Sequence, residues 1–292
     1  MVATGHAQAD GLAAWDPTQP APTELPAPHR NRLQRIADRA GYPVFVAIEL
    51  LLFFGLWEFV VVQVTLIPAA FLPPPSVIIE TLIGMFADGR MGEAIGASAV
   101  SWTAGFGLAI AVGVTIGLIM GTNETTRRLI SPIAWSFYST PYTWLLPLLV
   151  IWFGFSAAPI IVLVFYSAVL PILLTTAAGA ATVDPVIVNT ARVFGARSRE
   201  IHRKVTIPAT LPFIATGIRL AVPTSFIAVL IGEYLAGSAG VGRLLAIATG
   251  RFKIAEVFAV IVVLVVLSTS MLVFSSWLER RFSPWRTTGR GR

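Results

Sequence analysis

The sequence predicts an all-α membrane protein with about six transmembrane helices. Hydrophobic residues make up 55% of the 292 residues and charged residues only 12%, about half the usual share of roughly 25% in soluble domains. The mean hydropathy is +0.77, and several apolar runs approach the length at which a helix crosses a bilayer. The chain has no cysteine, which excludes disulfides, cysteine zinc sites and thiol chemistry.

Six apolar segments are long enough to cross about 30 Å of hydrocarbon at about 1.5 Å per residue. They cover approximately residues 43–64, 94–120, 129–152, 157–180, 209–232 and 254–277. The third segment contains Pro132, Pro141 and Pro147. Prolines leave backbone carbonyls unpaired, which a membrane tolerates only beside protein or water. We therefore expect the third segment to face the interior of the bundle.

The two ends of the chain differ in character from its centre. Residues 1–40 are rich in Pro, Ala and Thr and lack the apolar core of a signal peptide, so they predict a disordered tail. Residues 41–283 are the expected transmembrane domain, and residues 284–292 a basic tail. We expect both tails to be cytoplasmic.

Lys and Arg residues predict the orientation in the membrane. With the N-terminus in the cytoplasm, sixteen of the 21 Lys and Arg residues lie inside and four outside, while Arg219 lies within the fifth segment. Cytoplasmic loops carry such an excess of cations. The formal net charge of +6 thus reflects topology, and no nucleic-acid partner is expected.

A ladder of small residues, spaced four apart, runs along the second segment. It consists of Ala97, Ser101, Gly105, Ala109, Gly113, Gly117 and Gly121. A stripe without bulk lets another helix approach closely. One interpretation is ordinary packing within the chain. The other is a seam with a second membrane subunit, formed by Gly105, Ala109, Gly113 and Gly117.

A carboxylate near the outer end of the fifth segment is a candidate for the solute pathway. Glu233 is the second residue of the stretch GEYLAGSAGVGRLL. A charge inside a bilayer is costly unless it faces water or a partner, so such a residue is a functional candidate. We expect residues 237–242 to form a loop or re-entrant turn rather than a nucleotide site. The predicted pathway residues are Glu233, Tyr234, Ser238, Pro141 and Trp144.

One basic segment, residues 184–208, separates two of the most apolar runs. Asp184 and Pro185 are suited to start a helix, and Ile187, Ala191 and Phe194 then share one face. Gly195 predicts the end of this helix. Ser198 is expected to cap a second short helix that leads to Pro208 and the fifth span.

The sequence lacks the motifs of a nucleotide hydrolase. No G-x-x-x-x-G-K-[ST] phosphate loop occurs, and all three histidines lie outside the apolar segments. We therefore expect no ATP hydrolysis, catalytic residue, metal or cofactor in this chain.

The spacing N-T-A-x-x-x-G-x9-V-x-I-P, from Asn189 to Pro208, resembles the pattern E-A-A-x-x-x-G-x9-I-x-L-P of the membrane subunits of bacterial ABC importers. The stretches FLPPPSVI, LLPLLVIWFG and GEYLAGSAGVGRLL resemble the subfamily that imports nitrate, sulfonates, taurine or bicarbonate. The resemblance covers about residues 43–283. It implies the type I ABC importer permease fold.

The resemblance also implies partners. Residues 184–208 would be a coupling segment that docks on two ATPase subunits, which bind ATP and Mg. The docking residues would be Asn189, Thr190, Ala191, Phe194, Gly195, Ala196, Arg197 and Pro208. A second copy of the permease in the cell inner membrane and an extracytoplasmic substrate-binding protein complete the expected assembly. Asn189 stands where the family has glutamate, so a weaker hydrogen bond would replace the ion pair that the glutamate could form with an arginine of the ATPase.

Two other functions compete with this one. An ion-driven secondary transporter would use Glu49, Glu58 or Glu233 as its coupling carboxylate, and would work without an ATPase. A membrane enzyme is disfavoured because no nucleophile–base pair or metal set is present. For an importer, a small anion such as a sulfonate is the expected solute, with pyrimidine precursors or aromatic acids as the alternative.

Overall fold

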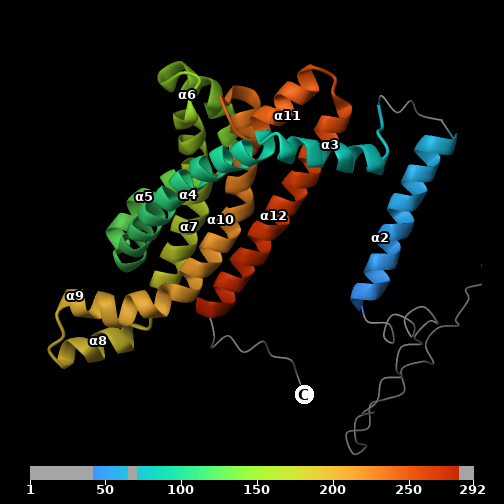
Figure 1. Ribbon diagram of the computed structural model, residues 1–292. Helices are drawn as coiled ribbons and strands as arrows, with labels where there is room; N and C mark the ends of the chain where they lie inside the picture. Colours follow the sequence, from blue (N-terminus) through green and yellow to red (C-terminus); the bar gives the residue numbers. More distant parts are fainter. Residues whose placement is uncertain (1–41, 65–70, 283–292) are drawn as a thin grey trace, which may run out of the picture. The chain divides into compact units, whose positions relative to one another are not determined.

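The computed structural model describes residues 42–64 and 71–282, and every regular element within them is a helix (Figure 1). This confirms the predicted all-α class. The tails predicted for residues 1–40 and 284–292 lie outside the described residues. By its contacts the chain divides into two compact units, residues 1–56 and 57–292.

Helix α2 (Tyr42–Phe59) contains the end of the first unit and the start of the second, and continues as the π-helical η1 (Val60–Val64). This continuous helix confirms the first predicted span. Apart from Glu49, the described part of the first unit is apolar on all sides, as expected of a helix surrounded by lipid. Leu51 and Leu52 are about 70% exposed, and Glu49 is exposed as well.

The second unit contains the remaining helices. Along the chain they are α3 (Pro75–Ala87), α4 (Arg90–Thr122), α5 (Glu124–Ser139), η2 (Tyr142–Leu145), α6 (Leu146–Phe153), α7 (Ala157–Ala181), α8 (Pro185–Val193), α9 (Ser198–Ile201), η3 (His202–Thr206), α10 (Ile207–Ala236), α11 (Val241–Gly250) and α12 (Ile254–Phe282). Five of the described helices are long and apolar enough to cross a membrane, and they correspond to five of the six predicted spans.

The third predicted span is divided. It consists of α5, a break at Thr140–Pro141, and η2 followed by α6. Pro147 lies in the first turn of α6, where its missing N–H costs nothing. The side chains of Trp135 and Ile151 are exposed. Ala134, Leu146 and Leu149 are buried, so the expectation that this segment faces the interior holds for only one side of it.

The core of the second unit lies between α4, α7 and α10. Its most deeply buried apolar side chains include Leu163, Val164, Ile172, Ala221 and Val229. Glycines of α4 let the backbone of α7 approach closely: a Cβ on Gly105 would stand 2.6 Å from the Ile161 carbonyl oxygen.

The small-residue ladder is therefore an interface within the chain. The four residues predicted to form a seam with a second subunit, Gly105, Ala109, Gly113 and Gly117, are all buried. At each of the three glycines, the three atoms nearest to an added Cβ all belong to α7, at 2.6 to 3.1 Å. That prediction is wrong because α7 already covers this face; the alternative of intrachain packing is confirmed.

A second apolar cluster joins α3 to α11 and α12. Met85, Met91, Val241 and Val260 are almost completely buried in it. The carboxylate of Glu58 accepts hydrogen bonds from the Ser76 N–H (3.1 Å) and hydroxyl (2.7 Å), and so caps the first turn of α3. In the second unit, α3, α6 and α11 lie at one end, and α8 and α9 at the other (Figure 1).

Candidate functional site

Helix α8 begins where the sequence predicts. The Asp184 Oδ1 accepts a hydrogen bond of 2.7 Å from the Val186 N–H, and Pro185 occupies the first turn. The carboxylate satisfies a backbone donor that the helix leaves unpaired, and its charge is favourable at the positive end of the helix dipole. The start of α8 is thus held rigidly.

The end of α8 is a Schellman motif. The Ala196 N–H donates to the Ala191 carbonyl (3.0 Å), and the Gly195 N–H donates to the Arg192 carbonyl (2.9 Å). Gly195 has a φ of +81°, which glycine adopts without the penalty that a Cβ brings. The predicted C-terminal cap is confirmed.

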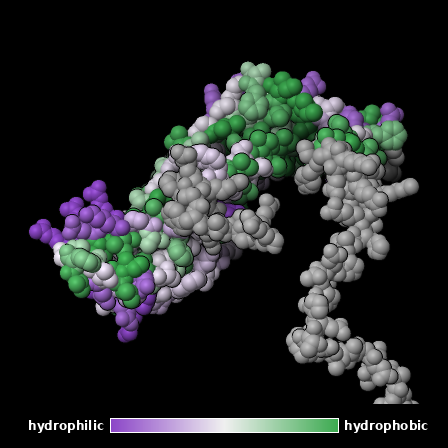
Figure 2. Space-filling view, turned by 90° about the horizontal axis from the view of Figure 1, so that it is seen from below, coloured by the Kyte–Doolittle hydropathy of each residue, from purple (hydrophilic) through white to green (hydrophobic). Residues whose placement is uncertain are grey.

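The apolar side chains of α8 are directed away from the rest of the chain. Val193 and Phe194 are each 86% exposed, and Val186 and Ile187 are exposed by more than half. In Figure 2, hydrophilic residues surround a hydrophobic area at the end where α8 and α9 lie. Such a patch with a polar rim is typical of a protein–protein contact.

The segment after α8 differs from the prediction in two respects. Residue Arg197, not Ser198, occupies the N-cap of α9, and the Glu200 carboxylate accepts from the Arg197 N–H at 2.9 Å. Pro208 does not begin a separate helix either, because α9, η3 and α10 form one continuous helix, Ser198–Ala236. The π turn η3 precedes Pro208, and such bulges accommodate a proline's missing N–H.

A polar cavity of about 310 Å³ separates α8 from the helix ends behind it. Its walls come from the ends of α4 and α7 and from α8, α9 and η3. The polar lining residues are Thr122, Asn189, Arg192, Ser198, His202 and Thr206. Asn189 Oδ1 lies 3.5 Å from Arg192 Nη1, at the limit of a hydrogen bond. The predicted residues Asn189 and Thr190 are both exposed.

At the opposite end of the unit, Glu233 holds three elements together. Its side chain belongs to α10 and is only 1% exposed. Oε2 accepts from the Ser98 hydroxyl of α4 (2.8 Å) and from the Gly242 N–H of α11 (2.9 Å). The Ser98 hydroxyl in turn accepts from the Val241 N–H (2.9 Å). Glu233 and Ser98 thus cap the N-terminus of α11 together.

The other residues predicted to line a pathway are on the surface. Tyr234, Ser238, Pro141 and Trp144 are exposed, and Trp144 borders a mostly apolar groove of about 590 Å³ beside the end of α10. Residues 237–240 form a loop, as expected, but the glycine-rich stretch then enters α11. Their role in a pathway stays a prediction.

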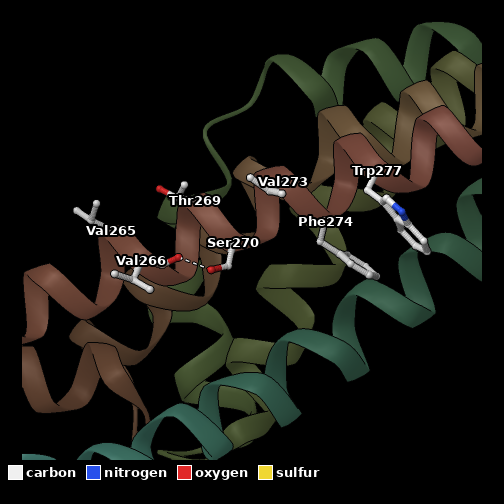
Figure 3. Close-up of a pocket in the computed structure, with 7 residues that line it drawn as sticks. All are labelled: Val265, Val266, Thr269, Ser270, Val273, Phe274 and Trp277. Atoms are coloured by element: carbon white, nitrogen blue, oxygen red, sulfur yellow. Dashed lines mark hydrogen bonds between the residues drawn. The ribbon is translucent and has the colours of Figure 1, made fainter. Parts of the chain in front are cut away.

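A groove of about 640 Å³ runs along one face of α12 (Figure 3). Its described lining comes from this helix alone: Val265, Val266, Thr269, Ser270, Val273, Phe274 and Trp277. The Ser270 hydroxyl donates to the Val266 carbonyl at 2.7 Å. None of these described lining residues has a titratable side chain. Among the described residues, no cluster of three His, Asp or Glu could hold a metal.

Ser98 is the site residue that the sequence analysis missed. It lies 135 residues before Glu233, beside the small-residue ladder of α4 rather than in it. The same helix also contains Ser101 and Thr103, and the sequence does not indicate which hydroxyl has a distant partner, so only the packing of α4 against α10 identifies Ser98.

Comparisons with known proteins agree with this architecture. Residues 113–284 match the family model "Binding-protein-dependent transport system inner membrane component". The taurine transport system permease protein TauC of Escherichia coli is 29% identical over 77% of this chain and 84% of its own length. The putative aliphatic sulfonates transport permease protein SsuC of Bacillus subtilis is 28% identical over 81% and 86%.

Among solved structures, an inward-facing MetNI methionine ABC transporter has a matching fold. The TM-score is 0.55 at 20% identity, and the match covers 70% of this chain and 99% of the other.

Proposed function

Because the chain belongs to the family of binding-protein-dependent transport system inner membrane components, we propose that it imports a small anion, driven by ATP hydrolysis on separate subunits. The homologues are permeases of ABC transporters, so the chain is a membrane-spanning permease subunit. We propose three further properties: the coupling to ATP hydrolysis, the orientation of the chain in the membrane and the solute.

The exposed apolar face of α8 supports this proposal most directly. A helix of nine residues gains little stability by itself, yet α8 is capped at both ends while Val193 and Phe194 remain almost fully exposed. This arrangement suits a rigid knob that fits a groove on an ATPase subunit. ATP and Mg would bind on that subunit.

The path from α8 to the opposite end of the unit is a single helix. Only Phe194 to Arg197 separate α8 from the helix Ser198–Ala236, which is roughly 58 Å long at about 1.5 Å per residue. Glu233 near its far end holds α11. A displacement of α8 by the ATPase would therefore be transmitted along α10 to α11. This is how ATP hydrolysis would open and close the pathway.

We place α8 and α9 on the cytoplasmic side, because that orientation puts the excess of Lys and Arg inside. The ends formed by α3, α6 and α11 then face outward, where an extracytoplasmic binding protein delivers the solute. A second copy of the permease would complete the pathway. The α4 ladder is not its contact surface.

A sulfonate-like anion is the solute we propose, since the homologues include taurine and aliphatic sulfonate permeases. Pyrimidine precursors and aromatic acids remain the alternative class. The ligand of the cognate binding protein, measured by calorimetry against taurine, alkane sulfonates, nitrate, bicarbonate and these alternatives, decides between them.

The coupling is tested with Phe194→Glu in the complex reconstituted with its ATPase subunits. A carboxylate on an exposed residue leaves folding unchanged but must be desolvated in an apolar groove, which is costly. We expect normal expression and thermal stability, with uptake and stimulated ATP hydrolysis reduced by about 10-fold or more. Arg128→Ala, at an exposed ion pair with Glu124 on α5, is the control and should transport normally.

Normal transport by Phe194→Glu would refute the docking role of α8. Uptake by the chain without any ATPase, abolished when the proton gradient is collapsed, would instead favour an ion-driven carrier. Two of the carboxylates that such a carrier would use, Glu58 and Glu233, cap helices in this structure.

A further inference from the structure

The turn between α11 and α12 contains an unusual backbone conformation. Phe252 has a φ of +55° and is the one non-glycine residue with positive φ among the described residues. The turn is a Schellman motif: the Phe252 N–H donates to the Thr249 carbonyl (3.1 Å), and the Lys253 N–H donates to the Ala248 carbonyl (3.0 Å). Phe252 thus occupies the same left-handed position as Gly195 at the end of α8.

The fold gives no reason for a phenylalanine at this position. Helix ends of this type favour glycine, because a Cβ crowds the following carbonyl in the left-handed conformation. Burial of the aromatic ring could offset this cost, but the Phe252 side chain is 84% exposed. A large apolar side chain in a strained conformation that buries little surface in its own chain indicates a role outside the chain.

The surroundings of Phe252 suit a protein partner. The ring borders a groove of about 460 Å³, whose other wall includes Pro73, Pro74 and Val77 before and in α3. Neighbouring Arg251 is exposed and has no salt bridge with the residues that the structure describes. Lys253, by contrast, is neutralised by Glu256 at 2.9 Å. Aromatic residues, phenylalanine among them, and arginine are both enriched in protein–protein interfaces.

We propose that Phe252, Arg251 and the adjoining groove form a contact for the extracytoplasmic substrate-binding protein. Its matching surface would be an apolar pocket for the ring, bordered by carboxylates that pair with Arg251. This inference rests on the proposed function, because the orientation given there places the α11–α12 turn outside. The turn joins α11, which Glu233 caps, to α12. Docking at Phe252 would therefore act on α11, the helix whose N-terminus Glu233 of α10 caps.

The test uses the complete complex in nanodiscs of phosphatidylethanolamine and phosphatidylglycerol. The cognate binding protein, identified by its stimulation of ATP hydrolysis in the wild-type complex, is titrated against Phe252→Gly. We expect the concentration of binding protein that half-saturates the stimulation of ATP hydrolysis to rise by about 10-fold or more in Phe252→Gly. The melting temperature of this variant should be unchanged or higher than that of the wild type, since glycine relieves the strain. Phe252→Tyr keeps the ring and should restore most of the affinity.

Arg251→Ala tests the electrostatic part of the contact. We expect the half-saturating concentration of the binding protein to rise by about fivefold at low salt. The difference from wild type should shrink as salt screens the attraction between Arg251 and the carboxylates of the binding protein. An unchanged concentration for Phe252→Gly overturns the proposal. The same holds if Phe252→Gly lowers the melting temperature in the nanodisc without weakening the binding protein, because the ring would then anchor the turn in the lipid interface.

Failure of the proposed function looks different from failure of this inference. If the wild-type complex neither hydrolyses ATP in response to a binding protein nor takes up solute, the proposed function is wrong. If the wild type responds and Phe252→Gly responds equally, only the contact at Phe252 is wrong.

Discussion

Gly117 offers the sharpest test of how α4 and α7 pack. A Cβ at this position would lie 2.7 Å from both the Leu173 carbonyl oxygen and the Thr176 Cβ, whereas ordinary contacts begin near 3.4 Å. The Gly117→Ala variant must therefore separate the two helices locally by about 0.7 Å, because neither neighbour is the free end of a flexible side chain.

Gly107 on the same helix is a matched control, since a Cβ there meets nothing within 4 Å. Both substitutions gain the helix preference of alanine over glycine, about 1 kcal/mol. Only Gly117→Ala also incurs the cost of overpacking, about 1–3 kcal/mol. The propensity contribution cancels in the comparison, so the two variants should differ by that overpacking cost in the free energy of unfolding.

Thermal unfolding of the purified subunit in detergent measures the difference. At about 2–4 °C per kcal/mol for a domain of this size, Gly117→Ala should melt roughly 2–12 °C below Gly107→Ala. Equal melting temperatures would refute the close α4–α7 contact. If Gly117→Ala melts normally but no longer associates with a second copy of the chain, the ladder would be a contact between subunits, contrary to the structure.

Three further predictions concern the helix ends. Asp184→Ala removes the cap of α8 and should weaken this helix locally by about 1 kcal/mol, seen as faster hydrogen exchange of its amides and less efficient coupling. Gly240→Ala, at a φ of +107° and with its Cβ directed into the Glu233 carboxylate, should lower the melting temperature by several degrees. The third concerns Asp88, whose pKa is lowered mainly by the side-chain hydrogen bond from Arg90. A lowered pKa stabilises the fold above the ordinary value of 3.8 and loses this effect as the pH falls through the folded-state value. The melting-temperature difference between wild type and Asp88→Asn should therefore be small, constant near neutral pH, and absent at strongly acid pH.

Each of these has an outcome that contradicts it. Unchanged exchange in α8 would mean that the Asp184 cap contributes nothing. Gly250→Ala is the control for Gly240→Ala, since its Cβ meets nothing within 4 Å; equal melting of the two would exclude crowding at Glu233. A difference at Asp88 that persists at acid pH would mean that the substitution acts other than through the charge.

Residues 184–208 show how far sequence patterns reach. The start of α8 at Asp184–Pro185 and its end at Gly195 follow from capping chemistry, which depends on a few neighbouring residues. The cap of α9 was misassigned, since Ser198 is a good cap by type but Glu200 satisfies the Arg197 N–H instead. Residue type alone therefore did not identify the N-cap of α9.

The sequence by itself determined the helical class, five of the spans and the capped α8, because hydropathy and caps are local properties. Tertiary structure decided which surfaces are free. Small residues permit close approach by any helix, so only the position of α7 shows that the α4 ladder is occupied. Glu233 finds Ser98 across 135 residues, and Phe252 is unusual only because its backbone is left-handed and its ring exposed. Contacts between distant residues depend on how helices pack, which no local pattern contains.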